Sequence, residues 1–147
     1  MSVTDSIVSE LKTASNVTNL VSTRIYQDYA YVKAAKPFVV VSRVSSQRHP
    51  HFSASSGLVN SRVQVDCVAS TRASRDATGE AVREALYTQT GSIGSTSASN
   101  DITVQNIDLQ DDRHETTTPD VGPGRSGQHG TFTRSMDFMV WHTESVP

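Results

Sequence analysis

The chain contains one cysteine, Cys67, and its thiol is the first candidate for chemistry. A catalytic thiol needs a partly exposed, electropositive surrounding that favours the thiolate. Cys67 instead alternates with Val63, Val65 and Ala69 at a spacing of two residues, which is typical of a half-buried strand. No histidine lies near it in the sequence. The pattern therefore predicts a small buried side chain and not a nucleophile.

Five histidines could indicate a metal site. His49 and His51 form an H-x-H pair, and His114 and His129 lie at the two ends of one polar segment. No cysteine and no second histidine pair stands at the spacing of a structural zinc site. We therefore interpret these residues as solvated loop histidines, and no metal is expected.

Other motifs of catalysis are missing from the sequence. Asp108, Asp111 and Asp112 could bind a cation, although the solvated end of a strand explains them more simply. The stretch GPGRSG at 122–127 lacks the preceding strand and the Lys-Ser/Thr of a phosphate-binding loop. No G-x-S-x-G nucleophile elbow occurs. The sequence predicts neither an enzyme nor a cofactor.

The composition indicates a single soluble domain over residues 1–147. The net charge is −2, which does not suit a strongly basic nucleic-acid binder. No apolar run approaches the ~20 residues of a membrane span, and the N-terminal segment lacks the pattern of a signal peptide. Residues 1–60 carry six basic and three acidic side chains, whereas residues 101–147 carry three and eight. This asymmetry fits a solvated acidic surface, or two faces that meet different partners.

Hydrophobic periodicity predicts an α+β fold. Apolar residues recur at helical spacing near the N-terminus, after a cap at Asn16, and from Ala77 to Leu86. Alternating or β-branched runs predict four strands, with a bulge near residues 105–106 in the third. We expect a mostly antiparallel four-stranded sheet with helices packed on one face. The expected strands begin near Pro37, Arg62, Ile102 and Thr131.

Two polar segments, residues 45–57 and 114–129, are predicted to be long loops between paired strands. Structureless loops beyond ~12–15 residues are uncommon in compact domains and are usually functional or disordered. These segments hold Ser, Thr, Gly and Pro with a few His and Arg, which suits ordering against a partner. The candidate interface residues are Gln47, Arg48, His49, His51, His114, Asp120, Arg125 and His129.

After an opening amphipathic helix, five stretches in order along the chain resemble the tail-terminator family of long-tailed bacteriophages, also called tail-completion or head–tail joining proteins. They are VTNLVSTRIY, PFVVVSRVS, RVQVDCVAST with the helix EAVREALY, QNIDLQDDRHE, and RSMDFMVWH. None of these is specific alone, and the resemblance rests on their order and on the chain length. The Gly/Pro-rich segment 116–130 departs from the pattern.

The resemblance implies a mixed α/β subunit that assembles into a hexameric ring. Such rings cap the tail tube, halt its polymerisation and join it to the head. The implied partners are further copies of the chain, the tail tube protein and a neck or head-completion protein. DNA would pass through the lumen without sequence-specific binding. The resemblance implies no catalysis, cofactor or membrane contact, and places the protein in the virion after synthesis in the host cytoplasm.

Two alternatives stay open at this point. One is another head–tail connector, such as a head-completion or minor tail component. The other is a small cytoplasmic enzyme that uses Cys67 or the histidines.

Overall fold

The computed structural model describes residues 3–30, 35–50, 55–87, 91–93, 102–117 and 131–143. Three helices and six strands lie in these ranges. The helices are α1 (Val3–Thr13), α2 (Ser15–Val21) and α3 (Arg72–Leu86). The strands are β1 (Ile25–Gln27), β2 (Phe38–Pro50), β3 (Ser55–Ala69), β4 (Gly91–Ile93), β5 (Ile102–Thr117) and β6 (Thr131–Thr143).

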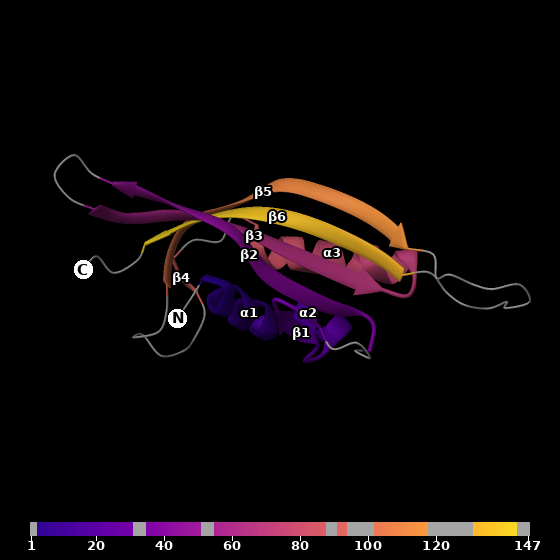
Figure 1. Cartoon of the computed structure of the whole chain (residues 1–147). Coiled ribbons are helices and arrows are strands. Elements are labelled where there is room, and N and C mark those ends of the chain that lie inside the picture. The colour runs from indigo at the N-terminus through magenta and orange to yellow at the C-terminus, as the bar shows by residue number, and fades with distance from the viewer. Residues whose placement is uncertain are drawn as a thin grey trace, which may run out of the picture.

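The strands form one sheet in the order β1-β2-β3-β6-β5-β4 (Figure 1). The four predicted strands are its four long members, and they pair antiparallel. The expected number of strands was wrong, because β1 and β4 add a short strand at each edge. β1 also runs parallel to β2, so the sheet is mixed. Strands of three residues are too short to show an alternating pattern, which explains why periodicity did not predict them.

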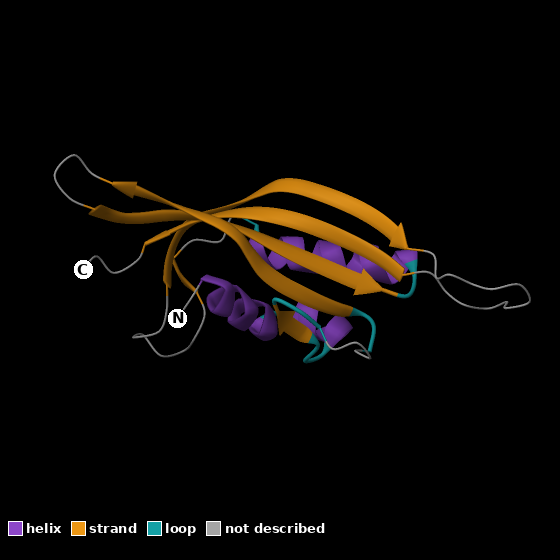
Figure 2. Ribbon diagram, in the orientation of Figure 1, coloured by secondary structure: helices purple, strands orange, loops and turns teal. Residues whose placement is uncertain are grey.

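The helices cover one face of the sheet, as predicted (Figure 2). α1 packs against β1 and β2, and α3 packs against β3 and β6. A single apolar cluster joins the helical stripes to one face of the strands, with Ile7, Leu11, Leu86 and Phe138 among its largest buried members. No helix in the described ranges is long and apolar enough to span a membrane.

The register of the central strands explains the alternation in the sequence. Val63 pairs with Phe138 and Val65 with Met136, so the apolar residues of β3 and β6 share the helical face. The predicted bulge in β5 is confirmed by a register shift between Val104 and Asn106. Further shifts occur in β5 between residues 109 and 111, and in β2 between residues 43 and 45.

The start of β2 is apolar on both faces, but helices cover only one of them. Val39 and Val41 are fully buried in the cluster beneath the helices. Val40 lies on the opposite face and is 9% exposed. On that face the neighbouring rings of Tyr26 and Phe38 meet edge to face, with centroids 5.9 Å apart. On this second face the strand therefore carries a local aromatic contact and not a layer of helices.

The predicted loop 45–57 is mostly strand. β2 continues to Pro50 and β3 begins at Ser55, so only residues 51–54 lie between them. The paired ends form a ribbon that projects past the helices (Figure 1). Without helices to cover either face, strand residues can be polar on both sides, and their sequence then resembles that of a loop. The loop 114–129 is shortened in the same way, because β5 continues to Thr117.

The cap expected at Asn16 is wrong, whereas α3 has a side-chain cap at its N-terminus. Thr71 caps α3, since its side chain accepts a hydrogen bond from the Ser74 amide at 3.1 Å. Asn16 does not cap α2, which begins after Ala14 without a side-chain cap. The Asn16 amide instead donates to the Ala81 carbonyl at 3.3 Å and so links α2 to α3.

Cys67 occupies the structural position that the sequence predicts. Its side chain is fully buried in the apolar cluster. Burial raises the pKa of the Cys67 thiol to about 12, so the thiolate is strongly disfavoured near neutral pH.

We expect the Cys67 thiol to resist an aromatic disulfide reagent at pH 8 in the native protein and to react after unfolding. Cys67→Ala should fold with a loss of about 1 kcal/mol, comparable to deletion of one buried methyl group. Cys67→Val tests tolerance of a slightly larger side chain. Fast labelling of the native protein, or loss of function in a stable Cys67→Ala variant, would contradict the structural role.

Candidate assembly surface

The two groups of predicted interface residues lie at opposite ends of the sheet. Gln47 is exposed on the projecting part of β2, and Arg48 and His49 follow it along the same strand. His114 is exposed near the other end of the sheet, on β5. The structure therefore does not bring the two groups together (Figure 1). The other four candidates, His51, Asp120, Arg125 and His129, lie outside the described residues.

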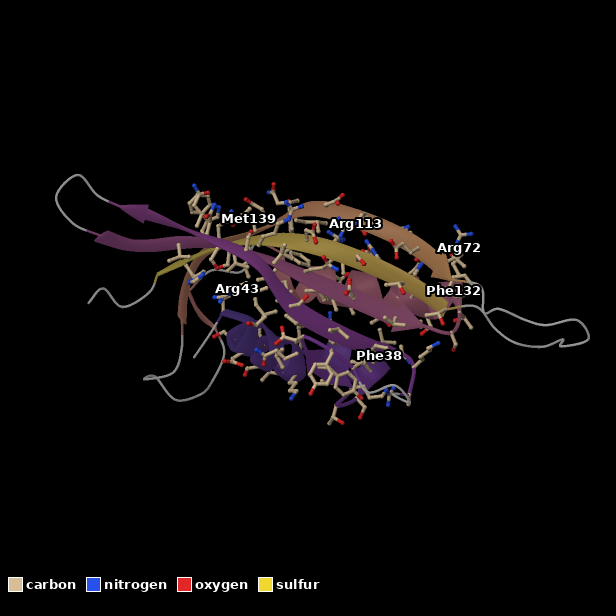
Figure 3. All side chains as sticks on the ribbon, in the orientation of Figure 1. Phe38, Arg43, Arg72, Arg113, Phe132 and Met139 are labelled. Carbon is tan, nitrogen blue, oxygen red and sulfur yellow. The ribbon has the colours of Figure 1, made fainter. Side chains whose placement is uncertain are left out.

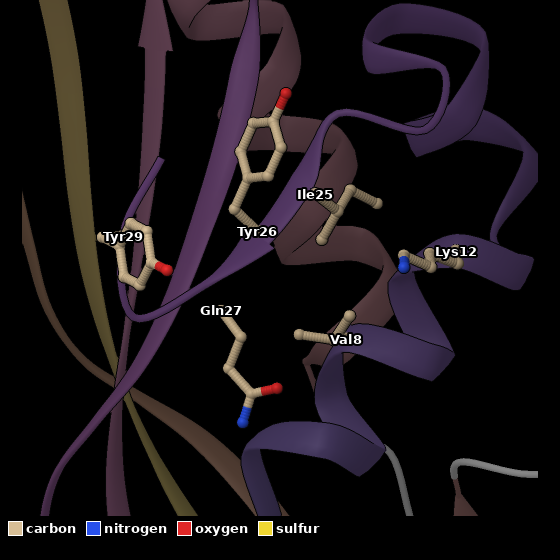
Figure 4. A pocket seen from close by; sticks show the side chains of 6 residues that line it. All are labelled: Val8, Lys12, Ile25, Tyr26, Gln27 and Tyr29. Carbon is tan, nitrogen blue, oxygen red and sulfur yellow. The ribbon is translucent and has the colours of Figure 1, made fainter. Parts of the chain in front are cut away.

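The described residues form a pocket of about 270 Å³ between α1 and the segment that contains β1 (Figure 4). The ionisable side chains of its lining are one lysine and two tyrosines, and the lining includes no carboxylate, histidine or thiol. This set does not form a general acid–base pair with a nucleophile. The lining residues are Val8, Lys12, Ile25, Tyr26, Gln27 and Tyr29.

Two acids of β5 bind arginines within the chain. Asp111 pairs with Arg113, and Asp112 pairs with Arg134. They lie within the strand and not at its end, so the interpretation as a solvated strand end is wrong. Within the described ranges, no group of three or more histidines, cysteines or carboxylates could hold a metal ion.

Arg134 is the centre of an ion-pair network beneath the sheet. It is 6% exposed and lies on the helical face of β6, two residues from Met136 in the core. Its Nε and Nη2 donate to the two carboxylate oxygens of Asp112 at 2.9 and 2.7 Å. Nη2 also donates to Glu80 of α3 at 3.1 Å. The guanidinium thus ties β5, β6 and α3 together through charge-assisted hydrogen bonds.

Gly79 of α3 makes room for this guanidinium. A Cβ atom at position 79 would lie 2.5 Å from Cδ of Arg134 and 2.7 Å from its Nη1. Arginine is flexible, but here its head group is held by Asp112 and Glu80, so it cannot move without losing those bonds. This contact explains a glycine in the middle of a helix, where it costs up to about 1 kcal/mol relative to alanine.

The opposite face of the sheet carries a second network, centred on Asp137 of β6. Its carboxylate is 5% exposed and lies between Arg62 of β3 at 2.8 Å and Arg113 of β5 at 3.0 Å. Arg113 and Met139 lie on this face, away from the helices (Figure 3). The network joins three adjacent strands, and its arginine side chains are about 40% exposed. Salt bridges therefore link the central strands on the uncovered face.

Both carboxylates have a lowered pKa. Hydrogen bonds from Arg134 hold the pKa of Asp112 below its ordinary value, against the opposing effect of burial. Burial raises the pKa of Asp137, but hydrogen bonds from Arg113 and Arg62 outweigh it, so that pKa is also lowered. Each aspartate is therefore charged at neutral pH and attracted to arginines that remain charged.

Sequence reasoning did not find either network, although two signals were present. Arg134 falls on the apolar face of its strand, between Phe132 and Met136. A charged residue at a core position requires a partner of opposite charge. The glycine within α3 was a second signal, because it leaves space for a large side chain. The partners Asp112 and Glu80 could not be identified, because their proximity depends on strand and helix packing.

The described residues form an α+β subunit with helices on one face of its sheet and salt bridges on the other. Residues 5–121 match the family described as tail completion protein gp17. The chain is similar to a solved chain from the virion of a native gene transfer agent particle, with a TM-score of 0.72 and 10% identity. The alignment covers 97% of this chain and 95% of that one. No curated protein sequence matches the chain.

Because the family match covers more than half of its length, the chain belongs to the tail completion protein gp17 family. This membership confirms the resemblance drawn from the sequence and identifies a structural protein of the phage tail. At 10% identity, the likeness to the gene transfer agent chain shows a shared fold.

We expect Gly79→Ala to destabilise the protein by about 1–2 kcal/mol, although this change usually stabilises a helix. The new methyl group displaces Arg134 from its ion pairs. Urea unfolding gives the free energy, and the same change in an Arg134→Ala background is the control. There the loss should vanish, because the space is free. A single Gly79→Ala variant that is more stable than the parent would contradict the contact.

The lowered pKa values of Asp112 and Asp137 predict a loss of stability in acid. Their contribution is complete above the ordinary aspartate pKa of about 4 and is lost as pH falls through the lower folded values. Asp112→Asn should be less stable at pH 7 and show a flatter pH dependence between about pH 5 and 2.5. Asp28→Asn is the control, since Asp28 forms no ion pair among the described residues. Equal pH slopes for the parent and Asp112→Asn would contradict the assignment.

Proposed function

We propose that this protein is a ring-forming subunit that ends the phage tail tube and joins it to the head or neck. The observation that carries the proposal is membership of the tail completion family. The fold supports it, since the sheet has one helix-covered face and one polar face, and leaves backbone groups at its edges for contacts between subunits. The expected ring has six copies, and the whole chain acts as one domain.

The proposed partners are the neighbouring copies, the tail tube protein and a neck or head-completion protein. DNA passes through the lumen, and no sequence-specific contact with it is needed. Synthesis in the host cytoplasm precedes incorporation into the virion. No cofactor takes part in these steps.

The predicted interface residues fit contacts at two separate places. Gln47, Arg48 and His49 lie on the projecting ribbon, whereas His114 lies near the opposite end of β5. A subunit within a ring stacked on a tube meets a neighbour on each side and another protein above and below. Separate polar regions are therefore suited to separate partners. His51, Asp120, Arg125 and His129 belong to the same proposal on sequence grounds.

A second candidate is another head–tail connector, a head-completion protein or a minor tail component. The structural likeness is compatible with this candidate as well. The description of the similar chain names the virion to which it belongs and does not give its position in the particle. An enzyme based on Cys67 is disfavoured, because that thiol is buried and has a raised pKa.

The test is to add the purified chain to polymerising tail tubes and to follow tube length by electron microscopy. We expect elongation to stop and a ring to appear at one tube end. Native mass spectrometry of the chain, alone and with tubes, should show a discrete oligomer of six copies. Heat-denatured protein is the control. A strict monomer in both conditions, with continued tube growth, would refute the proposal.

A further inference from the structure

A serine and a histidine interrupt the apolar rows of β3 and β6 on the helical face of the sheet. On β3, Ser61 lies between Val59 and Val63 in the alternation, and its side chain is fully buried. On β6, His142 follows Val140 in the same way and is 2% exposed. The Ser61 Oγ lies 2.8 Å from the His142 Nε2. The two polar side chains thus form a buried hydrogen bond between neighbouring strands.

A second hydrogen bond extends this contact to the surface. Ser46 of β2 is exposed and stands opposite Ser61 in the register, with 2.9 Å between the two Oγ atoms. A serine hydroxyl can donate one hydrogen bond while it accepts another. Ser61 can therefore bond to Ser46 and His142 at once, whichever nitrogen of the imidazole carries the proton. The three side chains connect β2, β3 and β6.

A bulge in β2 determines which serine reaches this position. The register passes from Arg43 to Ser45 on β2 over a single step of β3, so Val44 is the extra residue. It shifts the alternation by one, so that Ser46 shares the helical face with Ser61 and Ser45 lies on the opposite face. A bulge also bends its strand and increases the local twist, so the direction of β2 is set at this point.

The three bonded residues lie at the base of the projecting ribbon, which comprises residues 45–50 of β2 and 55–62 of β3 (Figure 1). Toward its tip the ribbon has two strands, because the register between β3 and β6 ends at Leu58 and Thr143. A two-stranded ribbon is only marginally stable alone and opens more easily than the central sheet. A side-chain link at its base therefore restricts the motion of everything beyond it.

We propose that the hydrogen-bonded chain of Ser46, Ser61 and His142 is a clamp that fixes the direction of the ribbon and so positions its contact residues. Ser61 and His142 are positioning residues, since they are buried and act through the ribbon. The inference rests on the proposed function, in which the ribbon residues 47–49 meet a partner in the assembled tail.

The first test measures opening of the ribbon by amide hydrogen exchange. Ser46→Ala removes the exposed member of the clamp, and we expect exchange in the ribbon to become about fivefold faster, as for the loss of one hydrogen bond. Exchange in the central sheet should not change. Ser45→Ala is the matched control, because Ser45 is also exposed and forms no side-chain hydrogen bond among the described residues. Ser61→Ala removes both bonds and should have a larger effect.

The second test measures the concentration of the chain that halts half of the growing tail tubes. Ser46→Ala should raise this concentration about fivefold, in parallel with the faster exchange, and Ser45→Ala should leave it unchanged. Ser46→Thr keeps the hydroxyl and suits a strand, so it should restore both slow exchange and tube arrest. A clamp that only supports the fold would alter exchange without this parallel change in tube arrest.

The outcomes separate the clamp from the proposed function. Unchanged ribbon exchange in folded Ser46→Ala and Ser61→Ala proteins would show that the clamp is wrong. Faster exchange with normal tube arrest would overturn the positioning role. Because Ser46 is exposed, its variants decide the question even where Ser61→Ala does not fold. If the parent chain halts no tubes, the proposed function fails and the positioning role with it, whereas the exchange comparison still decides whether the ribbon is clamped.

Discussion

The difference in length between the strands and the helices that cover them is the constraint on which the rest of this structure depends. Strands of 13–16 residues extend over roughly 45–55 Å at about 3.4 Å per residue. The longest helix, α3, has 15 residues and extends over only about 22 Å. Three short helices can therefore bury one central region of the sheet. The remaining strand surface must be polar, and its free backbone groups face solvent or a partner.

This constraint also explains which parts of the fold the sequence predicted. Beneath the helices, alternation is clear in residues such as Val63, Val65 and Cys67, and both the strand and the buried thiol were predicted correctly. Beyond the helices, β2 continues through Ser45, Ser46 and Gln47, which are polar and exposed, and this extension was interpreted as a loop. Hydrophobic periodicity reports burial, so it identifies a strand only where one face is buried.

The ion pairs show a second limit of sequence reasoning. Considered alone, Gly79 is unfavourable within a helix, and Arg134 interrupts the apolar face of its strand. The structure explains both residues by one contact, because the glycine gives the guanidinium its path to Asp112 and Glu80. Sequence reasoning met the same limit with the predicted interface residues. Their polarity was visible, but their separation to opposite ends of the sheet depends on strand direction.

A subunit of this kind suits assembly better than chemistry. Its buried polar groups, such as Arg134 and Asp137, are used to hold strands and a helix together. Its open edges and projecting ribbon leave hydrogen-bonding groups for other chains. The most direct measurement is a cryo-electron microscopy map of the assembled tail end. The account predicts a closed ring made of several copies of this chain at the end of the tail tube. A tail end at which this chain is absent, or is present as a single copy, would contradict it.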